Sequence, residues 1–128
     1  MLREMADSTY HGIIVQESLT ETSILDSVRI LSGKKGETWT LLKVEMEESN
    51  SGSFLENLQH KLKDNEAGVP YYSHFYRSGE LIVVFPGHIF HMTPEKGTWE
   101  DATSYGTSRG IPPEQLDFYP YKEEQEEF

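Results

Sequence analysis

The spacing of apolar residues along this chain predicts a sheet of about five to six strands. Side chains two residues apart share one face of a strand, and the segment 38–47 keeps Leu42, Val44 and Met46 on one face. The segment 10–19 contains three consecutive β-branched residues and is apolar on both faces. That pattern is typical of a strand that is central in its sheet or covered on both sides.

Three more strands are expected in succession, and together they form a meander. The first, at 71–77, ends in a tight turn at which Gly79 is free to adopt a positive φ. The second, at 81–85 ("LIVVF"), is predicted to be an inner strand because both of its faces are apolar. The third is expected at 89–93.

A shorter strand is expected at 28–32, between one helical turn at 23–27 and a loop. The loop contains "GKKG", in which Lys34 and Lys35 are expected to keep a turn soluble rather than to bind a phosphate. The residues around them do not match the G-x-x-x-x-G-K-[ST] pattern of a phosphate-binding loop, and they join two strands rather than a strand and a helix.

Two segments show the period of an amphipathic helix. In the first, Ser53 and Glu56 match the capping box that starts a helix. Three leucines, Leu55, Leu58 and Leu62, fall on one stripe of this helix together with Gln59, and Phe54 flanks the stripe. The second begins at Thr93 or at Thr98 and ends at Gly110. Together, the strands and helices predict an α+β fold: a two-layer sandwich with a mostly antiparallel sheet and two main helices.

The length of 128 residues fits one domain. We expect a flexible lead at 1–9, a single α+β domain at 10–121 and an acidic mobile tail at 122–128. The lead lacks the apolar core of a signal peptide, and no window approaches the roughly 20 apolar residues of a membrane span. These features predict a cytoplasmic location without a membrane partner.

Charge narrows the possible partners further. The chain has 22 acidic and 11 basic residues, a formal net charge of -11. Because nucleic-acid binding relies on Lys and Arg to displace counterions from phosphates, this balance argues against a nucleic-acid partner and against an anionic membrane. The absence of cysteine removes disulfides, thiolate metal sites and cysteine nucleophiles.

The candidate ligand-binding residues are Tyr72, His74, Tyr76 and His91. His74 alternates with the two tyrosines on one face of the strand at 71–77, so a titratable imidazole is flanked by two phenols. A cleft lined in this way could bind an aromatic or sugar-like ligand and transfer a proton. The alternative is an ordinary sheet face, because tyrosine is favoured in strands and packs well across them.

A metal site is a further alternative, although the sequence does not require one. His74 and His91 could meet across adjacent strands and His11 could join them, and three imidazoles can hold a catalytic zinc ion. His88 and His91 are three residues apart on one strand, so their side chains point to opposite faces and do not form a helix-type ligand pair. No cofactor can be named from the sequence.

Several sequence blocks resemble those of a family of small uncharacterised prokaryotic proteins. These blocks are "YHGIIVQESL", "WTLLKVE", "HFYRSGELIVVF" and "GIPPEQLDFYP". The resemblance would span nearly the whole chain and implies one compact cytoplasmic domain in a prokaryote. It carries over neither an activity nor a catalytic residue.

Two functions remain after these exclusions, and whether the protein is an enzyme stays open. The first is a non-enzymatic interaction or oligomerisation protein, in which surplus aromatic residues reach the surface. In this reading the protein is a homodimer, and an edge strand, the first or the last of the meander, pairs across a two-fold axis. The second is a small ligand-binding domain or enzyme that uses a pocket of tyrosine and histidine for acid–base or metal-assisted chemistry.

Overall fold

The structure is a computed structural model and describes residues 9–37, 39–77, 79–113 and 116. Of the lead expected at 1–9, only Thr9 is described, and it belongs to the first strand. The remainder of that lead and the acidic tail expected at 122–128 lie outside the described residues.

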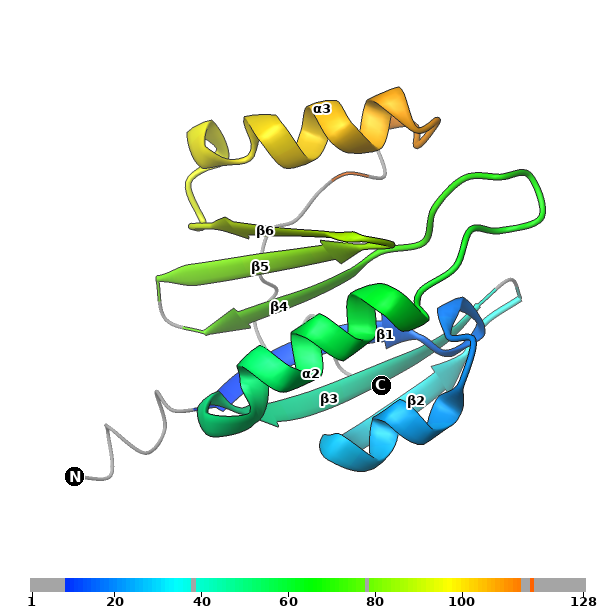
Figure 1. The fold of residues 1–128 in the computed structure, drawn as a ribbon, viewed down its shortest axis with the longest axis vertical. Helices are drawn as coiled ribbons and strands as arrows, with labels where there is room; N and C mark the ends of the chain where they lie inside the picture. The colour runs from blue at the N-terminus through cyan, green and yellow to red at the C-terminus, as the bar shows by residue number, and fades with distance from the viewer. Residues whose placement is uncertain (1–8, 38, 78, 114–115, 117–128) are drawn as a thin grey trace.

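Six strands form one antiparallel sheet in the order β2-β3-β1-β4-β5-β6 (Figure 1). They are β1 (Thr9–Val15), β2 (Arg29–Lys35), β3 (Thr40–Glu47), β4 (Ser73–Arg77), β5 (Glu80–Phe85) and β6 (His88–Met92). The antiparallel sheet and its two main helices confirm the predicted α+β sandwich. The first strand of the chain is central, as its apolar faces predicted, since β1 lies between β3 and β4.

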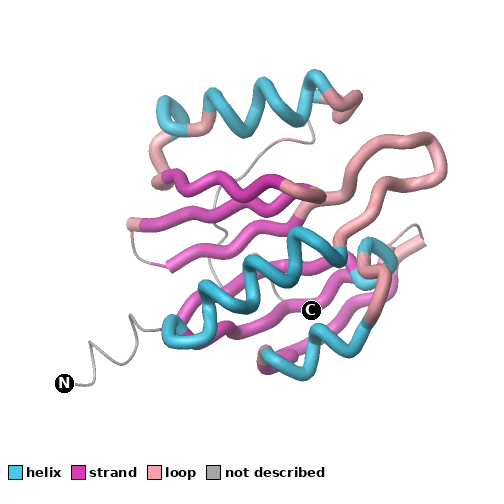
Figure 2. Tube along the Cα trace, in the orientation of Figure 1, coloured by secondary structure: helices cyan, strands magenta, loops and turns pink. Residues whose placement is uncertain are grey.

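One face of the sheet is covered by the helix α2 (Glu48–Lys61) and the short 3₁₀ segment η2 (Thr22–Ser27). Figure 2 shows both in front of the strands. The larger core cluster lies beneath them and consists of Tyr10, Ile14, Leu19, Leu42, Val44, Met46, Phe54, Leu55, Leu58, Leu62, Phe75, Ile82 and Val84. The apolar stripe predicted for the first helix therefore faces this core.

The opposite face is covered at its β5–β6 end by the helix α3 (Glu100–Ser108), which follows the 3₁₀ segment η3 (Lys96–Thr98). The core there consists of Leu81, Val83, Phe85, Met92, Trp99, Ala102, Ile111 and Leu116. Alternate residues of β5 thus enter different cores, as Ile82 and Val83 do. The run "LIVVF" is apolar throughout because a helix packs on each of its faces.

Both helices begin at other residues than the sequence favoured. The capping box predicted for Ser53 and Glu56 is wrong, because α2 begins five residues earlier, at Glu48. The carboxylate of Glu48 lies in the first helical turn and accepts a hydrogen bond from Arg77 of β4. Negative charge is favourable at a helix N-terminus, so Glu48 suits the first turn of α2. The helix α3 begins at Glu100, closer to the Thr98 alternative.

The interpretation of "GKKG" as a loop is also wrong. Lys34 and Lys35 belong to β2, where they pair with Leu41 and Thr40 of β3. The turn lies beyond them, closed by a hydrogen bond of 2.8 Å from the Gly36 amide to the carbonyl oxygen of Trp39. Both lysines are therefore on an edge strand. Among the helices in the described ranges, none is both long and apolar enough to span a membrane.

Candidate functional site

The structure brings His11, His74 and Tyr76 together on the sheet face opposite α2. Across β1 and β4, His11 pairs with Tyr76, and Ile13 pairs with His74. The ring of Tyr76 lies 6.3 Å from that of His11 and 6.4 Å from that of His74, measured between centroids. His74 and Tyr76 thus share one face of their strand, as predicted. This half-buried part of the sheet lies beside α3, on the side toward β2.

Of the other two candidate residues, Tyr72 lies on the same face as Tyr76, beneath α3, whereas His91 lies on the opposite face. Tyr72 precedes β4 and packs against Phe85 under α3, with a centroid distance of 5.4 Å. His91 is exposed on β6 and pairs with Ile82, whose side chain enters the core under α2. The strand β5 also separates β4 from β6. The expectation that His74 and His91 meet across adjacent strands is therefore wrong.

Electrostatic contacts connect His11 with the edge of the sheet. Its Nε2 lies 3.4 Å from Oε2 of Glu45, and Oε1 of Glu45 lies 3.8 Å from Nη1 of Arg29. The three side chains cross β1, β3 and β2 in a row. A carboxylate beside an imidazole can orient it for proton transfer. However, no group of three or more His, Cys, Asp or Glu side chains within the described ranges is arranged to hold a metal ion.

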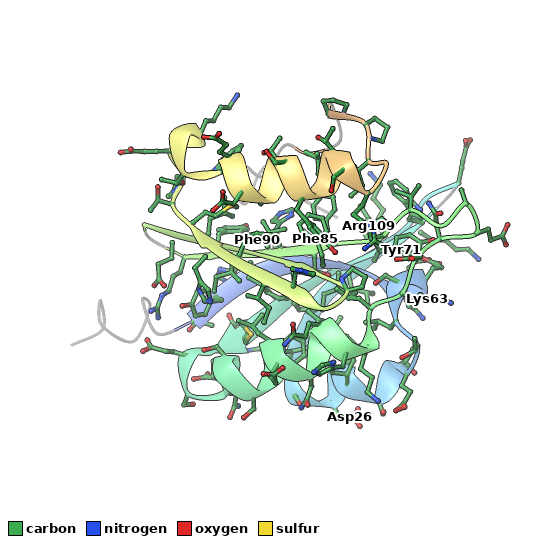
Figure 3. The ribbon with its side chains drawn as sticks, turned by 45° about the horizontal axis from the view of Figure 1, so that its top comes forward. Asp26, Lys63, Tyr71, Phe85, Phe90 and Arg109 are labelled. Atoms are coloured by element: carbon green, nitrogen blue, oxygen red, sulfur yellow. The ribbon has the colours of Figure 1, made fainter. Side chains whose placement is uncertain are left out.

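Much of the aromatic surplus packs beneath α3. Tyr105 lies with its ring 4.3 Å from that of His88, 5.0 Å from that of Phe85 and 5.7 Å from that of Phe90. Figure 3 shows Phe85 and Phe90 between α3 and the strands that carry them. The Arg109 side chain donates a hydrogen bond of 3.3 Å to the Tyr105 hydroxyl. These aromatic side chains hold α3 on the sheet.

A polar cluster that the sequence did not indicate lies at the start of α2. Tyr10 donates a hydrogen bond of 3.0 Å to Glu80, and the Arg77 guanidinium lies 4.4 Å from the centre of the Tyr10 ring. Arg77 also bonds both Glu80 and Glu48. Burial and the Glu80 carboxylate raise the pKa of Tyr10, and the bond to Glu48 raises the pKa of Arg77. A permanently charged arginine bonded to two carboxylates stabilises the structure by linking the elements that carry them. These elements are distant in sequence, so no local spacing of residues reveals the contacts.

The two edges of the sheet are β2 and β6. The homodimer expected through the first strand of the meander cannot use that strand, because β4 pairs with both β1 and β5. The last strand of the meander, β6, is an edge. The large hydrophobic side chains that are exposed within the described ranges all lie on the β2–β3 hairpin, namely Ile30, Leu31 and Trp39.

Comparison with known proteins adds no further assignment. No protein-family model matches this chain, and no curated protein or solved structure gives a significant match. The candidate functional surfaces of this chain are its two sheet edges and the His11–His74–Tyr76 face.

Proposed function

We propose that the protein is a cytoplasmic, non-enzymatic interaction protein that forms a homodimer through the edge of β6. The observation that carries this proposal is the edge itself. Within the described ranges only β5 pairs with β6, so one side of β6 offers its backbone N–H and C=O groups to another strand. The lack of cysteine fits a reducing compartment.

The sequence of β6 suits pairing with itself. The strand "HIFHM" contains no Asp, Glu, Lys or Arg. Its pairing with β5 has no bulge, from the pair Phe85–His88 at one end to the pair Leu81–Met92 at the other. In an antiparallel pair centred on Phe90, Ile89 of one copy lies opposite His91 of the other. No like charges then face each other, which favours a symmetric pair.

The hairpin geometry identifies the backbone groups that face outward. The residues that flank a two-residue loop exchange hydrogen bonds, and bonded and non-bonded pairs alternate from there. Phe85 and His88 flank the loop at 86–87, so Ile89 and His91 aim their N–H and C=O groups away from β5. Pairing of these few residues buries little area. The helix α3, which lies beside β6 (Figure 1), would have to add contacts to reach the roughly 1,000 Å² of a specific interface.

The test is sedimentation velocity of the purified protein over a range of concentrations, roughly 1 to 100 μM. We expect a dimer for the wild type and for His91→Ala, which removes only an exposed side chain. His91→Pro removes an outward N–H without removing a bond to β5, and we expect a monomer with an unchanged far-UV circular dichroism spectrum. A wild type that stays monomeric at 100 μM would falsify the dimer, and a dimeric His91→Pro variant would exclude the β6 edge.

A second candidate function is a small ligand-binding domain or enzyme on the His11–His74–Tyr76 face. The observation in its favour is the Glu45 carboxylate beside a half-exposed imidazole, His11, with a phenol next to it. The described residues offer no group of three metal ligands on this face, so the metal-assisted version stands only if isothermal titration with Zn²⁺ gives a site that both His11→Ala and His74→Ala remove. Absence of zinc-dependent heat from the wild type would exclude that version.

A further inference from the structure

The strand at the other edge, β2, is basic although the chain as a whole is acidic. Its seven residues, "RILSGKK", include Arg29, Lys34 and Lys35 and no acidic residue. Three of the 11 basic residues of the chain thus lie in one strand, against a formal net charge of -11. Such a concentration of one charge gives this edge an electrostatic character that differs from the average surface.

The positive charges of β2 remain available to a partner. Arg29 has a side chain that is 77% exposed, and its contact with Glu45 is a long one of 3.8 Å. Within the described ranges, no carboxylate lies within ion-pair distance of Lys34 or Lys35. Glu17, in the segment that follows β1, attracts Lys35 electrostatically, but its carboxylate oxygens are held mainly by Thr40, through two hydrogen bonds of 2.7 Å.

The same edge carries exposed apolar side chains. Ile30 is 48% exposed and Leu31 39%, and Trp39, at the end of the hairpin, is 40% exposed. A bulge between Ile30 and Ser32 leaves Leu31 without a pairing partner on β3. Exposed apolar groups that gather beside unpaired backbone groups are a feature of strands that bind an extended peptide, because pockets for alternate side chains supply specificity.

A second copy of β2 does not fit this edge. In an antiparallel two-fold pair in which Ile30 lies opposite Gly33, Arg29 of each copy lies opposite Lys34 of the other, and both side chains point to the same face of the sheet. Like charges that face each other across a strand pair are destabilising, and lysines and bulges are the usual means of keeping edge strands from pairing with themselves. The occupant must therefore bring negative charge.

We propose that β2 binds an extended acidic peptide segment of another protein, which adds a strand to the sheet. Acidic side chains of the peptide lie opposite Arg29 and Lys34, which point to the same face of the sheet because they pair with Glu45 and Leu41. An aliphatic or aromatic side chain of the peptide contacts Ile30 on the other face. This surface is at the opposite edge of the sheet from β6, so it is independent of the proposed dimer and can be tested in a dimer or a monomer.

Fluorescence anisotropy with a labelled synthetic peptide tests the proposal. The probe is a peptide of about nine residues, long enough to span an edge strand, in which Glu alternates with Val and Phe. We expect saturable binding to the wild type that weakens as salt is raised, because exposed charge pairs are screened. A peptide of the same pattern with Lys in place of Glu should not bind, and N-methylation at alternate backbone positions should abolish binding of the acidic peptide.

Charge reversal with a matched control locates the binding surface. Lys34→Glu should weaken binding about tenfold, equivalent to about 1.4 kcal/mol, whereas Lys63→Glu, an equal charge change at an exposed site outside β2, should change it less than about twofold. Equal losses from both variants, or binding of the basic peptide, would overturn the proposal. The proposal would also be overturned if the wild type were a dimer and Lys34→Glu a monomer, because that result would show that the β2 edge binds a second copy. Circular dichroism of each variant excludes unfolding as the cause.

Discussion

Substitution of Gly12 by alanine tests the packing between the two central strands. Gly12 lies on β1 directly opposite Phe75 of β4. A Cβ atom at this position would lie 2.2 Å from Cδ1 of Phe75 and 2.7 Å from the backbone oxygen of His74. Both distances are far shorter than a van der Waals contact. Phe75 is fully buried and packs edge-on against Phe54, with 6.0 Å between ring centroids, so its ring cannot move aside alone.

The expected loss follows from these contacts. Overpacking of a core costs about 1–3 kcal/mol, and here a backbone atom as well as a ring must shift. An intrinsic gain of roughly 0.5–1 kcal/mol from replacing glycine offsets part of that cost. We expect Gly12→Ala to lower the free energy of unfolding by about 2 kcal/mol, a large fraction of the roughly 5–15 kcal/mol of a typical domain.

The assay is urea unfolding followed by circular dichroism, with Gly52→Ala as the control. Gly52 lies in α2 with open space around its Cα, so alanine there should stabilise the protein by about 0.5–1 kcal/mol. A Gly12→Ala variant within about 0.5 kcal/mol of the wild type would refute the packing argument. In the double variant with Phe75→Leu, the combined loss should be smaller than the sum of the single losses, and strict additivity would locate the strain elsewhere.

Two further predictions concern groups with a shifted pKa. Burial and the bond to Glu80 raise the pKa of Tyr10, so the stabilisation by its neutral phenol is present below the ordinary value of 10.0 and is lost as pH rises through the higher folded value. Tyr10→Phe should cost about 0.5–1.5 kcal/mol at pH 7 and flatten stability above pH 10 in urea titrations. The bonds from Thr40 lower the pKa of Glu17, so their stabilisation is present above 4.5 and is lost as pH falls through the lower folded value. Glu17→Gln should make the free energy of unfolding less dependent on pH in that acidic range, with a loss below about 1 kcal/mol at neutral pH because the site is exposed. An unchanged pH dependence in the acidic range would contradict the hydrogen bonds between Thr40 and Glu17.

The elements that could be predicted from sequence are those specified by neighbouring residues. The run at 81–85 is apolar on both faces, and it is an inner strand between two helices for that reason. The turn at Gly79 was predicted because glycine readily adopts a positive φ, and φ there is 76°. Alternation also assigned His74 and Tyr76 correctly to one face of their strand.

What could not be predicted depends on contacts between distant residues. The carboxylate of Glu48 in the first turn of α2 bonds Arg77 of β4, and no pattern near Glu48 indicates that partner. The same limit applies to the site, since the insertion of β5 between His74 and His91 follows from strand order. The lysines of β2 looked like turn residues because glycine flanks them, and only the register with β3 reveals their edge position.

The central position of β1 has a consequence for the order in which the sheet can assemble. The hairpin β2–β3 and the meander β4–β5–β6 each join strands that are neighbours in sequence, whereas β1 must pair with both β3 and β4. Pairing between distant segments is slow, because the entropy of closing a long loop is lost before the contact is gained. During synthesis on a ribosome, β1 emerges first, yet its second partner appears only when residues 73–77 have been made. The strand β1 is made before the other five strands but acquires its second neighbour late, and until then it presents an open edge through which nascent chains can associate wrongly.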